Sequence, residues 1–177
     1  MYSIKNFSND LEDIVSSKSS YEEIIKETAY RMSFLLDNDF IFDNDFINKV
    51  RSNQINNTLY KSNINDFVIQ VFTWEANVST PIHDHFTWGL MGVYYNKLKV
   101  IEYSIKKIDN GVYDLNETDT YIATEGDICY ILPPNEEIHK ISNPTNKLSI
   151  SIHVYGKPIE EYNIYDLERN KIFKVNS

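Results

Sequence analysis

Cysteine is nearly absent from this sequence: Cys129 is the only one among 177 residues, so no disulfide can form within one chain. Small secreted domains usually depend on several disulfides, and this lack favours a reducing compartment. No apolar run approaches the roughly 18 residues that cross a bilayer, and the N-terminus lacks an apolar stretch of signal-peptide length. These absences predict a cytoplasmic protein without membrane association.

Positive charge is also scarce, with 17 Lys and Arg residues against 26 Asp and Glu residues and a net charge of −9. Nucleic acids and acidic membrane surfaces are bound by clustered Lys and Arg, so neither is expected as a partner. The sequence has no glycine-rich phosphate loop, no CxxC pair and no GxSxG motif, which argues against phosphoryl transfer and serine hydrolysis. We expect a small-molecule substrate and a monomer or homodimer.

The pattern of apolar residues changes at about residue 65. Before it, apolar residues three or four positions apart predict short helices within 11–17, 21–38 and 45–52, the second capped by Ser19 or Ser20. After it, alternating segments separated by turn residues predict strands within 66–74, 89–108, 112–115, 120–124, 127–132, 139–143 and 147–156. The expected turns are 96–97, 109–111, 125–127 and 143–146, and the Asn-rich stretch 53–65 is expected to be an irregular connector.

This division predicts a mainly β protein with a small helical N-terminal cap. A chain of 177 residues with 42% hydrophobic residues can bury one sizeable core, so 1–177 is expected to be a single domain. The cap would occupy 1–60 and the β core 65–160. Many short strands with tight connections favour a sandwich or a barrel.

All four histidines fall within the β-rich part of the chain. His83 and His85 are two residues apart, so in a strand both imidazoles would project into one cavity while Asp84 points away. His139 follows on a later strand, which a barrel could bring opposite this pair. Three neutral imidazoles suit Fe(II), Zn or another transition ion, and the sequence therefore predicts a three-histidine metal site.

The fourth histidine belongs to a different pattern. Ser151, His153 and Tyr155 alternate along the segment SISIHVY, so their side chains should face the same way. A hydroxyl, an imidazole and a phenol in line can form a hydrogen-bonded chain in which Ser151 fixes the tautomer of His153 and His153 orients the Tyr155 hydroxyl. Tyr155 could then donate to a substrate or to oxygen.

These residues together resemble the two motifs of the cupin superfamily. The matching positions are the HxH of His83 and His85, then Gly126, Pro133-Pro134, His139 and Asn143. Within that superfamily the chain is similar to the cysteine dioxygenase type of thiol dioxygenase, especially its bacterial members. That likeness covers about residues 60–160 and rests on Val71–Trp74, Thr80–His85, Trp88-Gly89 and the late Ser151, His153 and Tyr155.

The resemblance implies a fold, a metal and an activity. The fold would be the cupin double-stranded β-helix, or jelly-roll, barrel, and the cofactor would be non-haem Fe(II) held by His83, His85 and His139. The activity would be a dioxygenase reaction that uses O2 to oxidise a small thiol to a sulfinate. Tyr155, supported by His153 and Ser151, would be the catalytic group.

The sequence departs from the family at three places. Many cupins have a glutamate ligand where this chain has Gly89, so the ligand set would contain no carboxylate. The segment 86–92 has no cysteine to cross-link with Tyr155. Where the family binds a substrate carboxylate with arginine, this chain has Asn56 or Asn57, with Lys61, Gln54 and Arg51 as alternatives.

The substrate is therefore open, and two other functions stay in view. One is a three-histidine iron oxygenase that acts on a small molecule without sulfur. The other is a non-catalytic cupin that binds a metal or a small ligand. Among the remaining residues, Trp88 and Phe86 are expected in the core more than in a pocket wall, Cys129 in a buried strand, and Glu136-Glu137 on the surface.

Overall fold

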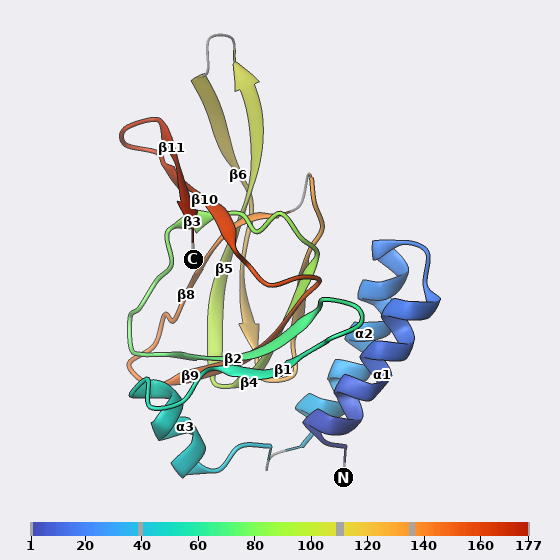
Figure 1. The fold of residues 1–177 in the computed structure, drawn as a ribbon. Coiled ribbons are helices and arrows are strands. Elements are labelled where there is room, and N and C mark those ends of the chain that lie inside the picture. The colour runs from blue at the N-terminus through green and yellow to red at the C-terminus, as the bar shows by residue number, and fades with distance from the viewer. Residues whose placement is uncertain (1, 39–40, 109–111, 135–136, 177) are drawn as a thin grey trace.

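Three helices cover one side of the molecule in this computed structural model, which describes residues 2–38, 41–108, 112–134 and 137–176 (Figure 1). The helices are α1 (Ile4–Ser17), α2 (Tyr21–Leu36) and α3 (Asn44–Arg51). Each begins after a residue whose side chain accepts a hydrogen bond from the first turn: Ser3, Ser20 and Asp43. The first helix starts earlier than predicted, because Ser3 and Asn6 cap each other. None of the described helices is both long and apolar enough to cross a membrane.

Two antiparallel sheets form the rest of the fold. The strands are β1 (Thr58–Lys61), β2 (Val68–Trp74), β3 (Ile82–His83), β4 (Gly89–Tyr95), β5 (Lys97–Ile108), β6 (Val112–Thr124), β7 (Ile128–Ile131), β8 (Ile138–Ser142), β9 (Ser149–Tyr155), β10 (Glu161–Asp166) and β11 (Lys171–Asn176). One sheet has the order β1-β2-β9-β4-β7 and the other β11-β10-β3-β8-β5-β6. Neighbours such as β2 and β9, or β3 and β8, are far apart in sequence. This order confirms the mainly β jelly roll that the cupin resemblance implied.

The sheets extend beyond the predicted range 65–160. Strand β1 lies inside the segment 53–65 that was expected to be irregular, and β10 and β11 add two strands after residue 160. The predicted strands 112–115 and 120–124 form one long strand, β6, because the polar residues between them keep pairing with β5 across a single bulge. The predicted turn 109–111 lies outside the described residues.

The helices pack on the outer face of the first sheet, so its inner face is left for a site. Phe7, Leu11, Met32 and Leu35 from the helices join Ile69, Leu90, Ile152 and Val154 in one buried cluster. Gly92 permits the close approach of α2, because a Cβ atom there would lie 2.6 Å from the Met32 sulfur. Figure 1 shows α1 and α2 side by side along this face.

Candidate metal centre

Three histidines converge between β3 and β8. His83 on β3 lies directly opposite His139 on β8 in the antiparallel register, and His85 follows His83 by two residues. The ring centroids are 4.6 Å apart for His83 and His85, and 4.9 Å from either ring to His139. The three potential ligand atoms lie within 4.8 Å of one another. The structure thus brings together the three residues that the sequence predicts as ligands.

Buried ring nitrogens in this cluster have no hydrogen-bond partner. In the described part of the chain, three buried side-chain polar atoms lack one: His85 Nδ1, His139 Nε2 and Thr28 Oγ1. Because buried polar atoms are almost always paired, two orphaned nitrogens in one cluster indicate a missing partner. His83 Nδ1 lies 3.0 Å from the Pro81 carbonyl oxygen, which leaves its Nε2 for an ion.

The histidines also have the protonation state that a metal requires. Burial lowers the pKa of His83, and it lowers the pKa of His85 and His139 further, with the neighbouring histidines adding to the effect on these two. Neutral imidazole is the form that coordinates a metal. These residues fit a transition ion.

A buried carboxylate fixes the strand that carries the first two histidines. Asp84 is 2% exposed and points away from the cluster, as predicted. It accepts hydrogen bonds from the Asn163 backbone and side-chain nitrogens, both at 2.8 Å, and from the Tyr165 hydroxyl at 2.7 Å. Strand β3 ends at His83, so these bonds to β10 hold the extended backbone where sheet pairing stops.

Ser151, His153 and Tyr155 form a buried hydrogen-bonded chain along β9. Ser151 Oγ lies 2.8 Å from His153 Nε2, and His153 Nδ1 lies 3.0 Å from the Tyr155 hydroxyl. Trp74 Nε1 donates to Ser151 Oγ at 2.9 Å, an additional member that the sequence did not predict. The hydrogen-bonded chain has the order that the alternation of Ser151, His153 and Tyr155 predicted.

The order of these residues determines which atom donates in each hydrogen bond. Since Ser151 accepts from Trp74, its own hydroxyl proton can go to His153 Nε2, and His153 Nδ1 then donates to the Tyr155 oxygen. Burial lowers the pKa of His153 to about 3, so its ring has a single proton near neutral pH. Burial raises the pKa of Tyr155, which keeps its hydroxyl protonated. That hydroxyl is therefore left to donate into the cavity.

The position of Tyr155 also explains why residue 89 is a glycine. The Tyr155 ring stacks on His85, with centroids 5.3 Å apart and an interplanar angle of 21°. A Cβ atom on Gly89 would lie 3.0 Å from Tyr155 Cδ1 and 3.0 Å from the Val154 carbonyl oxygen. A larger residue at position 89 would displace the tyrosine ring.

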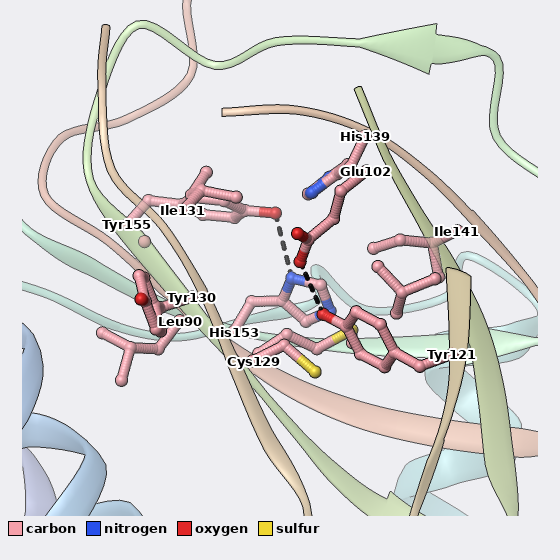
Figure 2. Close-up of a pocket in the computed structure, with 13 residues that line it drawn as sticks. Leu90, Glu102, Tyr121, Cys129, Tyr130, Ile131, His139, Ile141, His153 and Tyr155 are labelled. Carbon is pink, nitrogen blue, oxygen red and sulfur yellow. Dashed lines mark hydrogen bonds between the residues drawn. The ribbon is translucent and has the colours of Figure 1, made fainter. Parts of the chain in front are cut away.

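Two cavities meet the histidine cluster from different sides. The first, of about 330 Å³, is lined by all three histidines, by His153 and Tyr155, and by aromatic residues of β2; we name it the apolar cavity. The second, of about 540 Å³, is lined by His139 with Glu102, Tyr121, Cys129 and Tyr130; we name it the acidic cavity. A void of about 20 Å³ between them is lined by residues of both (Figure 2). It has room for about one water molecule.

The residues considered as alternative partners for a substrate carboxylate lie elsewhere. Arg51 pairs with Glu75 at 2.7 Å on the surface, and Lys61 and Gln54 are exposed. Within the described residues, none of these three lines a cavity that contains a histidine. Of the two asparagines at the expected arginine position, Asn57 approaches the apolar cavity only through Gln70, whose Nε2 lies 3.5 Å from Asn57 Oδ1.

Two cavity residues, Gln70 and Glu102, were not predicted from the sequence. Gln70 faces the apolar cavity because it alternates with Phe72 and Trp74 on β2, a period that could have identified it. Glu102 on β5 faces the acidic cavity. The side of the sheet to which it points could not be assigned from alternation, because a bulge follows it between Glu102 and Tyr103.

Several minor expectations have mixed outcomes. Trp88 is buried in the helix-facing core against Gly156, as expected, whereas Phe86 is 38% exposed. Cys129 is only partly buried, because it lines the acidic cavity, and burial raises the pKa of its thiol. The prediction of a surface position is wrong for Glu137, which is buried and accepts a hydrogen bond from the Phe86 backbone at 3.0 Å. Glu136 lies outside the described residues.

Comparison with known proteins gives structural likeness but no sequence family: no family model matches the chain. It is similar to oxalate oxidase in complex with glycolate, with a TM-score of 0.40 and 15% identity over 52% of this chain and 42% of that one. A Cupin 2 conserved barrel domain protein from Salinispora arenicola CNS-205 matches with a TM-score of 0.40 and 17% identity over 55% and 71% of the two chains.

A sugar phosphate isomerase of the cupin superfamily from Silicibacter pomeroyi matches with a TM-score of 0.43 and 10% identity over 65% and 70% of the two chains. The matched part of this chain spans less than half the length of the oxalate oxidase. At this level the matches indicate nothing about activity, and the fold assignment rests on the strand order of the two sheets.

Proposed function

We propose that this protein is a non-haem Fe(II) dioxygenase that uses O2 to oxidise a small thiol to a sulfinate. One observation carries the proposal: a cluster of three histidines with unpartnered nitrogens shares a cavity with a hydrogen-bonded chain that ends at the Tyr155 hydroxyl. The resemblance of these positions to the cysteine dioxygenase type of cupin supports the choice of iron and of a thiol.

The ligand set favours an anionic substrate atom. His83, His85 and His139 are neutral. The nearby Asp84 carboxylate accepts hydrogen bonds from β10 and is not a ligand. Iron held by these histidines would keep its full double charge, which favours a thiolate and supplies a site for O2 chemistry. Both oxygen atoms pass to the sulfur, and the electrons that the sulfur loses reduce O2, so no other reductant is needed.

The remaining cavity residues would orient the reactants and exclude water. Tyr155 donates its hydroxyl proton toward the space beside His85, where it can hydrogen-bond to an oxygen or sulfur atom of the reactants. Phe72 and Trp74 cover the His153 ring, at centroid distances of 4.6 and 6.4 Å, and keep this side apolar. Gln70 is the amide of the apolar cavity and can bind a polar end of the substrate.

The test is O2 uptake by protein loaded anaerobically with Fe(II), with cysteamine, cysteine and 3-mercaptopropionate as substrates and mass spectrometry of the products. We expect one O2 consumed per sulfinate formed, and no uptake by the zinc-loaded protein, because Zn has no redox chemistry. Iron-loaded protein that consumes no O2 with any of these thiols would contradict the proposal. O2 uptake with a product mass gain that does not lie on sulfur would replace thiol oxidation by another oxygenase reaction.

A further inference from the structure

The cavities around the histidines contain a carboxylate and no cation. Among the described residues that line the apolar cavity, the acidic cavity and the void between them, none is a lysine or an arginine. Glu102 is the only carboxylate in the same set. A substrate carboxylate would find no cationic side chain here, whereas a substrate cation would find an anionic one.

Glu102 lies next to the metal cluster in the sheet. It is directly opposite His139 in the β5–β8 register, and His139 is directly opposite His83 in the β3–β8 register. Residues directly opposite in antiparallel strands share a face, with Cβ atoms about 4.5–5.5 Å apart. Figure 2 shows the Glu102 and His139 side chains entering the pocket together, with the Tyr155 hydroxyl facing them.

The Glu102 carboxylate keeps capacity to bind a ligand. Tyr121 donates its hydroxyl proton to Glu102 Oε1 at 2.8 Å, and no second hydrogen bond to this carboxylate occurs among the described residues. An ionised carboxylate has about four acceptor positions, so most of them are open. Glu102 is not one of the clustered ligand atoms, which come from the three histidines.

A second group points into the same space. His139 lines all three cavities, and its buried Nε2 has no partner. A ligand held at His139 can therefore extend through the void toward Glu102 without leaving the cavity. The aromatic residues Tyr121 and Tyr130 also line the acidic cavity, and aromatic ring faces attract cations.

We propose that Glu102 binds the ammonium group of a short aminothiol without a carboxylate, while its sulfur lies at the three histidines. This inference rests on the proposed thiol dioxygenase function and names its substrate class. A primary ammonium suits the site because it donates charge-assisted hydrogen bonds to the open carboxylate oxygens. The net charge of −9 also favours the approach of a cation over that of an anion.

Binding can be measured without turnover. Ligand-detected NMR under anaerobic conditions would compare cysteamine, neutral 2-mercaptoethanol and anionic 3-mercaptopropionate on the wild type and on Glu102→Gln. We expect wild-type protein to bind cysteamine at least about tenfold more tightly than 3-mercaptopropionate, and Glu102→Gln to lose about tenfold for cysteamine only. Equal losses for cysteamine and 2-mercaptoethanol, or a wild-type preference for the anion, would overturn the proposal.

The substitution is conservative and has a matched control. Glutamine keeps the shape of Glu102 and can still accept from Tyr121, so the fold should persist, which a melting curve checks. Asp114→Asn removes one negative charge from an exposed position on the adjoining strand β6, outside the cavities. If Asp114→Asn weakens cysteamine binding as much as Glu102→Gln, the effect belongs to overall charge and the assignment of Glu102 is refuted.

O2 uptake with the same thiols separates this inference from the proposed function. Selective cysteamine binding that depends on Glu102, without O2 consumption, would keep the ammonium site and refute thiol oxidation. O2 consumption with a KM for cysteamine that Glu102→Gln leaves unchanged would keep thiol oxidation and refute the ammonium site. We expect Glu102→Gln to raise KM for cysteamine about tenfold and to leave KM for 2-mercaptoethanol within about twofold.

Discussion

The two cavities that meet at His139 differ in the chemical groups that line them. The apolar cavity holds all three histidines, the aromatic rings of β2 and the hydroxyl of Tyr155. The acidic cavity holds one histidine and the Glu102 carboxylate, which Tyr121 orients. We infer that the oxidation takes place in the apolar cavity, and that the acidic cavity binds the charged end of the substrate. His139 is the residue that both functions share.

Removal of His139 should therefore have the largest effect. His139→Ala deletes a ligand common to both cavities, and a lost ligand should cost more than the 10- to 100-fold in metal affinity typical of groups that only support ligands. Elemental analysis of iron-loaded protein should find one iron per chain in the wild type and almost none in the variant. His153→Ala is the control and should retain iron; if it loses iron equally, the division between ligands and hydrogen-bonded chain is wrong.

A pair of tyrosine variants tests whether the cavities divide chemistry from recognition. Tyr155→Phe removes the hydroxyl that points into the apolar cavity and should lower kcat about 100-fold with little change in iron content. Tyr121→Phe removes the same atom from the acidic cavity and should alter KM for cysteamine more than kcat. Steady-state O2 uptake measures both. Equal effects of the two variants on kcat would remove the distinction.

Asp84 lies behind the histidines and lines neither cavity, so its loss should destabilise the protein without altering thiol preference. Asp84→Asn leaves the partly buried donors of Asn163 and Tyr165 without a charged acceptor, and should lower the free energy of unfolding by about 2 kcal/mol. Urea denaturation would measure this loss. Asp114→Asn on the surface should change stability by less than about 0.5 kcal/mol.

The smallest expected effect is the pH dependence of stability that comes from His153 in the buried hydrogen-bonded chain. Burial lowers the pKa of His153 from 6.5 to about 3 in the folded protein, so between these values the unfolded chain binds the additional proton. The contribution of His153 to stability is therefore fully present above pH 6.5 and falls by about 1.4 kcal/mol per pH unit below it. Urea unfolding of metal-free protein between pH 5 and 8 should show a slope that His153→Gln reduces; identical slopes would contradict burial as the cause.

The sequence was sufficient where the pattern is local. Ser151, His153 and Tyr155 occupy one strand, and the period of two alone places them in line, so their hydrogen-bonded order could be predicted. The same period places Gln70 on one face of β2 with Phe72 and Trp74, so its position in the cavity was also predictable. His83 and His85 also share a direction, even though β3 ends at His83.

The rest of the site depends on pairing between distant strands. The row of Glu102, His139 and His83 exists because β5 and β3 flank β8 in a particular register, which sequence spacing does not reveal. Glu137 reads as surface charge because an adjacent glutamate suggests a solvated pair, yet the Phe86 backbone gives it a buried partner. Likewise, β10 could not be placed beside β3 without knowledge of the bonds to Asp84.

The central claim is that the three histidines hold iron at which a thiol binds through sulfur. X-ray absorption spectroscopy of anaerobic, iron-loaded protein tests it most directly, before and after addition of cysteamine. We predict a first shell of nitrogen and oxygen atoms that gains a sulfur atom when cysteamine is added, and no gain in the His139→Ala variant. Iron that keeps the same shell with every thiol, or that gains sulfur without His139, would contradict the account.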